Sequence, residues 1–247
     1  MKKRGQVTLF VIIAIVIVAG AFLVLYTQTD ILGQRAERIP EIAPIRAEIQ
    51  NCLDQTAFDG ITLAGLQGGY ISLPNLTFTT NFSEIPYSYY EGRSLLLTLG
   101  GIEKEVSAYV SLMLPKCVDF SKWPDYAITP SNAISTTLIK NNLVKVDVKW
   151  PVIIKKADST YRLEKFSTSI PIRLGMIHNI TRTIVTGEIK EPNLIRADYF
   201  SDVYNEYNIR IDLLPFNTTL IYLITDPLSK FKNQPINYTF LFANKFK

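Results

Sequence analysis

A run of twenty residues without a charged side chain, from Val7 to Tyr26, is the feature that most restricts how this chain can fold. A helix of this length extends about 30 Å at 1.5 Å per residue, which matches the hydrocarbon thickness of a bilayer. The run has no polar face, whereas a helix on the surface of a globular core keeps one. It therefore predicts a membrane-spanning helix.

The charges before this run predict its orientation. Residues 1–5, "MKKRG", carry three of the 26 basic residues and no acid, which leaves 23 basic against 22 acidic residues in the rest of the chain. Under the positive-inside rule the N-terminus is cytoplasmic and the body is extracellular. We therefore expect a single-pass protein of the cell membrane. The nearly neutral body argues against nucleic acid as a partner.

Cys52 and Cys117 are the two cysteines of the chain. An even pair in an extracytoplasmic domain is more often a disulfide than a metal site. Zinc needs about four ligands, while the chain offers two cysteines and one histidine. The sequence therefore predicts a disulfide and neither a metal nor a cofactor.

Asparagine-linked glycosylation is a second prediction that follows from an extracellular location. Five Asn-x-Ser/Thr acceptor sequences occur, and they mark exposed sites if the host glycosylates asparagine. The alternative is that these acceptor sequences occur by chance, because the chain is rich in Asn, Ser and Thr. The acceptor residues are Asn75, Asn81, Asn179, Asn217 and Asn237.

The glycine-rich stretch 63–74, "LAGLQGGYISLP", follows a helical pattern. Apolar residues at three- and four-residue spacing predict a helix over residues 42–66, which ends at these glycines. A phosphate-binding loop has the opposite order, strand before glycines and helix after them. We therefore expect a helix end, a turn at Gly68 or Gly69, and a strand that starts at Tyr70, with no bound anion.

The remaining pattern divides into a helix-rich and a strand-rich part. A second helix is predicted over residues 102–114 and ended by Pro115, whereas residues 75–93 resemble a loop. From residue 134 onward, alternating apolar and charged residues predict strands, interrupted by a helix over 174–189. This segregation favours an α+β fold with helices packed on a mainly antiparallel sheet.

The pattern of charge and hydropathy thus divides the chain into five consecutive predicted parts. They are a basic leader over 1–5, a membrane helix over 6–26, a polar helical extension or linker over 27–41, a helix-rich part over 42–133 and a strand-rich part over 134–247.

The N-terminal residues "KKRG" and "QVTLFVIIAIVIVAG" resemble the class III signal peptides of archaeal type IV pilin-like proteins. The resemblance implies cleavage between Gly5 and Gln6, and an apolar helix that anchors the subunit and later packs inside a filament. The fifth residue after the cleavage site is Phe10, where many pilins carry glutamate. Archaellin-like subunits also lack that glutamate.

A second resemblance covers residues 50–120. The sequence "CLDQTAFDGITLAGLQGGYISLP", followed by "IPYSYYEG" and a helix leading to a second cysteine, is similar to an uncharacterised family of single-span surface proteins in small-genome archaea. This resemblance implies a location and an architecture, and no known activity.

A search for catalytic residues finds no recognisable active-site pattern. His178 is the only histidine of the chain. Because the chain contains no Gly-x-Ser-x-Gly motif that would supply a nucleophile, we interpret His178 as a structural residue. The four-residue spacing of Asp198, Asp202 and Glu206 is typical of a solvated helix face, with cation binding as the alternative. The chain is therefore not expected to be an enzyme.

The aromatic residues Tyr87, Tyr89 and Tyr90 are expected to pack on a sheet edge, with sugar or partner binding as the alternative. The predicted function is a membrane-anchored, outward-facing structural or adhesive protein, a pilin-like subunit that self-assembles or joins related subunits. The alternatives are a surface binding protein that does not assemble and, less favoured, an envelope hydrolase.

Overall fold

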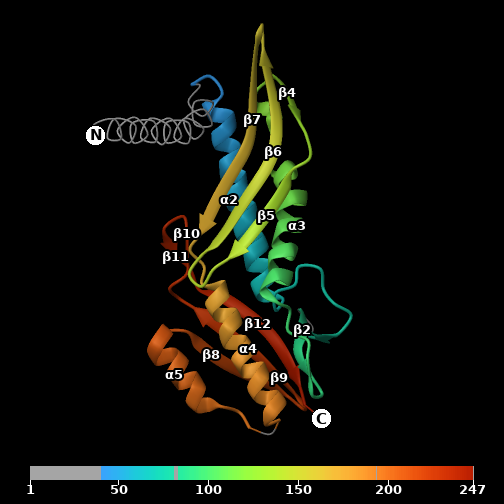
Figure 1. Ribbon diagram of the computed structural model, residues 1–247, viewed down its shortest axis with the longest axis vertical. Coiled ribbons are helices and arrows are strands. Elements are labelled where there is room, and N and C mark those ends of the chain that lie inside the picture. Colours follow the sequence, from blue (N-terminus) through green and yellow to red (C-terminus); the bar gives the residue numbers. More distant parts are fainter. Residues whose placement is uncertain (1–39, 81–82, 193, 247) are drawn as a thin grey trace, which may run out of the picture. The chain divides into compact units, whose positions relative to one another are not determined.

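The structure is a computed structural model that describes residues 40–80, 83–192 and 194–246 (Figure 1). The chain divides into a unit of residues 1–46 and a compact unit of residues 47–247. The predicted leader, cleavage site and membrane span lie outside the described residues. Within the described part of the chain, no helix is long and apolar enough to cross a membrane.

The first two described helices, α2 (Ala43–Leu66) and α3 (Leu99–Cys117), are antiparallel. The antiparallel direction follows from two contacts: Cys52 is bonded to Cys117, and a Cβ on Gly60 of α2 would lie 2.8 Å from the Tyr109 ring of α3. Both predicted helices are confirmed. The predicted end at Pro115 is wrong, because a proline this close to the end of α3 removes only one helical hydrogen bond.

The glycine turn after α2 is confirmed. Gly68 and Gly69 have φ angles of +60° and +100°, which L-residues with a side chain rarely adopt. The predicted strand directly after the turn is wrong, because other groups take its backbone donors. The N–H groups of Ile71 and Ser72 donate to Glu105 Oε2 at 2.9 Å and 2.8 Å.

The first sheet has four strands, with β6 (Val144–Lys156) at its centre. β7 (Ser159–Ile170) pairs with β6 along one side, and β5 (Ile134–Ile139) and β4 (Ala127–Pro130) pair with it along the other, all antiparallel. The alternation predicted for this region is confirmed, because every second side chain of β6 is buried. Helices α2 and α3 lie beside this sheet (Figure 1).

Helix α3 satisfies the backbone donors of β5, which is an edge strand of this sheet. Alternate residues of the strand are about 6.6 Å apart and residues four apart on a helix are about 6 Å apart, so the two spacings match. Edge strands otherwise leave such donors unpaired. The hydrogen bonds are Ser135 N–H to Ser111 Oγ (2.9 Å), Thr137 N–H to Ser107 Oγ (2.9 Å) and Ile139 N–H to Glu103 Oε1 (2.8 Å).

The second sheet has the strand order β1-β2-β12-β9-β8, with β3 paired to β2. The pair of β2 and β12 is parallel, and the other pairs are antiparallel. An α+β fold with mainly antiparallel sheets is therefore confirmed. The strands are β1 (Thr77–Thr79), β2 (Glu84–Tyr90), β3 (Arg93–Ser94), β8 (Arg210–Phe216), β9 (Thr219–Asp226) and β12 (Tyr238–Lys245).

The interpretation of residues 75–93 as a loop is wrong, since β1 and β2 lie there. Strand β2 pairs with β1 on one side and β12 on the other, and its residues Tyr87 and Tyr89 are buried. The described elements also include a 3₁₀ turn (Phe120–Lys122) and a small hairpin of β10 (Lys230–Phe231) and β11 (Gln234–Pro235).

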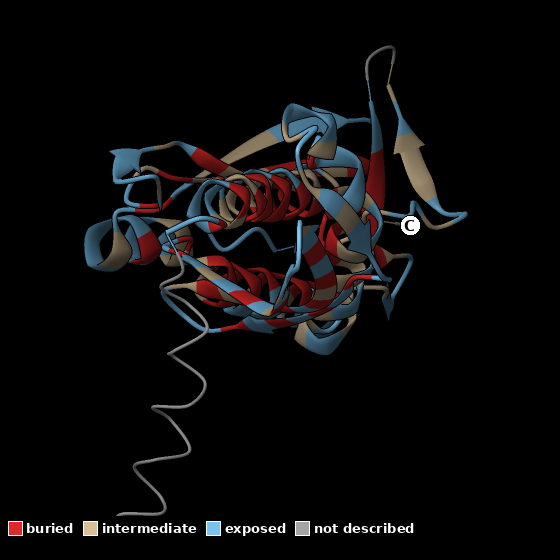
Figure 2. Cartoon of the chain, turned by 90° about the horizontal axis from the view of Figure 1, so that it is seen from above, coloured by how far each residue is buried: buried red, intermediate tan, exposed pale blue. Residues whose placement is uncertain are grey.

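Helices α4 (Leu174–Lys190) and α5 (Ala197–Tyr207) lie against the second sheet (Figure 1). The helix predicted over 174–189 is α4, whereas α5 adds a helix to a region expected to form strands. Aromatic rings of β9 and β12 fill the space beneath them: Tyr222 and Phe242 stack with ring centres 4.9 Å apart. Buried residues run along the inner helices and strands (Figure 2).

Candidate functional site

The predicted pairing of Cys52 with Cys117 is confirmed. A disulfide joins the two residues, whose Cα atoms are 5.7 Å apart. It connects the N-terminal half of α2 to the last residue of α3. A bond that closes a loop of this length stabilises the fold by about 4 kcal/mol through loop-closure entropy.

Four of the five predicted glycosylation sites lie on described residues, and all four asparagines are exposed. Asn75 lies before β1, Asn179 on the outer face of α4, Asn217 in the turn between β8 and β9, and Asn237 just before β12. Asn81, like Gly5 and Gln6, lies outside the described residues. Exposure permits glycosylation at these four sites, and their occupancy stays a prediction.

His178 has the structural position that the sequence suggested. It is 7 % exposed, and its Nε2 lies 2.8 Å from the carbonyl oxygen of Leu97. Burial lowers the pKa of this imidazole. Its hydrogen bond links α4 to the segment that precedes α3.

The acidic row of Asp198, Asp202 and Glu206 lies exposed on α5. Arg196 donates to both carboxylate oxygens of Asp198, at 2.8 Å to 3.2 Å. Among the described residues, no group of three or more His, Cys, Asp or Glu side chains is placed to hold a metal ion.

The tyrosines of β2 pack, as expected, although not on a sheet edge. Tyr87 and Tyr89 are buried, and β2 lies inside the sheet between β1 and β12. Tyr90 is half-buried, with its ring against Tyr87 and beneath the ammonium group of Lys245. The buried rings are therefore not available for stacking on a sugar.

Two concave features lie beside α4 in the described part of the chain: one of about 520 Å³ next to Leu97 and His178, and one at the C-terminal half of the helix, with an outer and an inner part, called here the cavity between α4 and α5. An outer cavity of about 400 Å³ is lined by the C-terminal half of α4 and by residues just before α5. An inner pocket of about 60 Å³ shares Thr183, Gly187, Leu194 and Arg196 with it. The inner pocket is also lined by Glu188 and by the aromatic residues Tyr199, Phe200 and Tyr222.

Glu188 joins α4 to the two strands beneath it. The residue is 4 % exposed. The Tyr222 hydroxyl of β9 donates to Glu188 Oε1, and the Asn244 amide of β12 donates to Glu188 Oε2 at 2.5 Å. Among the described residues Asn244 Oδ1 has no hydrogen-bond partner. The cluster is thus a buried polar network with one unused acceptor.

Burial dominates the ionisation of this network. It raises the pKa of Glu188 from 4.5 to about 7, although the hydrogen bonds from Tyr222 and Asn244 act in the opposite direction. Burial and the neighbouring Glu188 also raise the pKa of Tyr222. Glu188 lies in the last turn of α4, where the helix dipole further disfavours a negative charge.

A buried ion pair fixes the other end of α4. Arg173 donates through Nε to Asp226 Oδ2 at 3.0 Å and through Nη2 to Asp226 Oδ1 and the carbonyl of Tyr207. The Ser229 hydroxyl donates to the same carboxylate at 2.6 Å. These bonds connect α4, α5 and β9, which form the walls of the cavity.

Neither the cavity nor the role of Glu188 is evident from the sequence. The available signal was the position of Glu188, four residues after Ile184 and within the apolar stripe of α4, where an acid is unexpected. Its partners Tyr222 and Asn244 are 34 and 56 residues away and carry no motif.

Comparisons with protein families, with curated proteins and with solved structures find no match.

Proposed function

We propose that this chain is a membrane-anchored, outward-facing structural or adhesive protein of the cell envelope and acts as a pilin-like subunit. The observation that carries the proposal is the disulfide between Cys52 and Cys117, which forms in oxidising compartments. It supports an extracytoplasmic location for the domain that follows the basic leader and the apolar run of residues 7–26.

The domain has features that suit exposure outside the cell. Four acceptor asparagines are on its surface, and α3 covers an edge of the first sheet that would otherwise attract other chains. The proposal includes no catalytic step, no cofactor and no nucleic-acid partner. Its partners are the membrane and other subunits with the same kind of apolar helix.

The first test is mass spectrometry of the protein isolated from membranes. An N-terminus at Gln6 supports processing of a pilin-like leader, whereas an intact Met1 contradicts it. Non-reducing peptide mapping of the same sample is expected to recover the peptide pair that contains Cys52 and Cys117.

Assembly is tested by two substitutions in the apolar run. Packing between helices depends on close side-chain contact, while anchoring depends on hydrophobicity. Gly20→Leu is therefore expected to leave the protein in the membrane and to reduce the multimer recovered after cross-linking, with Ile15→Leu as the matched control. Normal assembly of Gly20→Leu, or no multimer from the wild type, favours the anchor without a filament.

A second candidate function is a solitary surface binding protein. The cavity between α4 and α5 favours it, because its volume of about 400 Å³ falls in the range of small-ligand sites. A filament subunit is expected to form a multimer that Gly20→Leu impairs, whereas a solitary binding protein is expected to form none. Both proposals require the same membrane anchor.

A further inference from the structure

We propose that the cavity between α4 and α5 binds an anionic sugar, a monosaccharide that carries a carboxylate or a phosphate. The proposal deepens the second candidate function and does not depend on filament assembly. It rests on the charges at the cavity mouth, the rings on its walls and the polar network on its floor.

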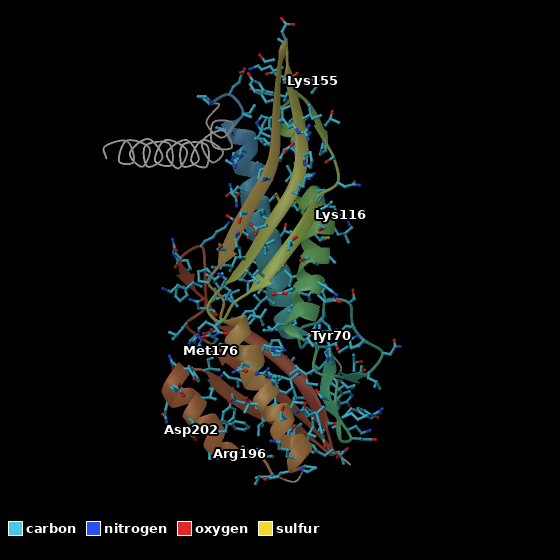
Figure 3. The ribbon with its side chains drawn as sticks, in the orientation of Figure 1. Tyr70, Lys116, Lys155, Met176, Arg196 and Asp202 are labelled. Atoms are coloured by element: carbon cyan, nitrogen blue, oxygen red, sulfur yellow. A yellow bond between two sulfur atoms is a disulfide. The ribbon has the colours of Figure 1, made fainter. Side chains whose placement is uncertain are left out.

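Basic side chains outnumber acidic ones among the residues that line the outer cavity. Arg182, Lys190 and Arg196 are all exposed there, together with the single acid Glu191. Arg196 (Figure 3) is already paired with Asp198, so Arg182 and Lys190 are the cations that the proposal assigns to the ligand. Arg182 donates to the neutral amide oxygen of Asn179 at 2.7 Å, so its positive charge is not neutralised by that contact. Guanidinium and ammonium groups at a cavity mouth favour a carboxylate or phosphate on the ligand.

The walls of the cavity suit the body of a sugar. The hydroxyl-bearing residues Thr183 and Thr186 line the outer cavity, and the aromatic residues Tyr199 and Phe200 line the inner pocket. The Thr183 hydroxyl donates to the carbonyl oxygen of Asn179 at 3.1 Å and can accept from a sugar hydroxyl, whereas aromatic rings offer apolar faces. A monosaccharide fits in about 400 Å³.

The floor supplies an acceptor for a hydroxyl group. Glu188 lines the inner pocket and uses one acceptor position on each carboxyl oxygen, for Tyr222 and Asn244. A carboxyl group has acceptor positions beyond these two in its protonated as well as its ionised form, so Glu188 has capacity for a ligand hydroxyl. The inner pocket of about 60 Å³ holds a group of that size.

Isothermal titration of the full-length protein in nonionic detergent tests the proposal. The probes are D-glucuronate, D-glucose 6-phosphate and the neutral sugar D-glucose. We expect at least one anionic sugar to bind with Kd below about 10 mM and D-glucose to bind at least about tenfold more weakly. Equal binding of D-glucose, or no binding of either anion, overturns the proposal.

Two variants locate the binding site. Arg182→Gln with Lys190→Gln removes two cations from the mouth, and Gly187→Leu places a side chain in the cavity, since a Cβ there meets nothing within 4 Å. Both variants are expected to weaken anion binding at least about tenfold without lowering the melting temperature below that of the wild type. The matched control is Lys116→Gln, on the exposed end of α3.

Unchanged binding in both cavity variants overturns the proposal, as does an equal loss in the Lys116→Gln control. Selective binding of the carboxylate or of the phosphate probe supports it and identifies the anionic group. These variants leave residues 1–26 intact. A negative result in the sugar titration therefore leaves the anchoring and assembly experiments unaffected, and a negative result in those experiments leaves the titration unaffected.

Discussion

In the wild type the free energy of unfolding is expected to decrease as pH rises, because Glu188 loses its proton. Glu188→Gln is expected to remove this decrease. The wild-type carboxyl group is 4 % exposed and accepts hydrogen bonds from Tyr222 and Asn244. A glutamine has similar size and keeps an acceptor for the Tyr222 hydroxyl. Its amide N–H finds an acceptor in Asn244 Oδ1, which is unpaired among the described residues, once the Asn244 amide rotates.

The sign and the size follow from the pKa of Glu188, which is about 7 in the folded protein and 4.5 in the unfolded chain. Between these pH values only the folded state holds the proton, so the free energy of unfolding decreases as pH rises and levels off above about 7. At about 1.4 kcal/mol per pH unit, the wild type loses on the order of 3 kcal/mol across this interval relative to the glutamine variant.

Urea unfolding of both full-length proteins in nonionic detergent, at pH values from about 4.5 to 8, measures this difference. The fluorescence of Trp150, which is buried in β6, reports the transition. His178, whose pKa is lowered by burial, is present in both proteins, so its contribution cancels in the difference. A stability difference that stays constant with pH refutes the reasoning.

Tyr222→Phe provides a second check on the same carboxyl group. The substitution removes the hydroxyl that donates to Glu188 and lowers its pKa. The wild-type decrease in stability is therefore expected to extend to higher pH in this variant. A shift to lower pH contradicts the assigned direction of the hydrogen bond.

Four further variants test the fold. Replacing Cys52 and Cys117 together with serine is expected to lower the free energy of unfolding by about 4 kcal/mol, measured by urea unfolding. Gly175→Ala is expected to destabilise the fold, because its Cβ would lie 2.6 Å from the Lys140 carbonyl oxygen, whereas Gly187→Ala in the same helix meets open space and is expected to stabilise by about 0.5–1 kcal/mol. Ser107→Ala leaves a backbone donor of β5 without its acceptor and is expected to lower the free energy of unfolding by about 1–3 kcal/mol. On a native gel this variant is expected to show slower-migrating aggregates that the wild type does not form.

Local patterns in the sequence were sufficient to predict the elements with strong periodicity. The buried stripe of α2 and the alternation in β6 follow directly from residue spacing. The disulfide was predictable because two cysteines allow one pairing. These features depend on short stretches of chain or on a count.

Contacts between distant segments explain the failures. Residues 71 and 72 lack a strand partner because Glu105 takes their N–H groups, and β2 is a strand because β12, more than 140 residues later, pairs with it in parallel. The inner pocket likewise depends on Tyr222 beneath α4. No single window of the sequence contains both members of any of these pairs.

The disulfide has a mechanical consequence for a domain held by an N-terminal anchor. A pulling force that enters through the start of α2 reaches Cys52 and passes through the bond to Cys117, which is 65 positions further along the chain. The intervening segment, including most of α2 and α3, stays outside the path of the load. About 220 Å of extended chain is thereby withheld from unravelling under tension. In a domain held at its N-terminus, tension therefore passes from the start of α2 directly to the chain that follows α3 and enters the first sheet.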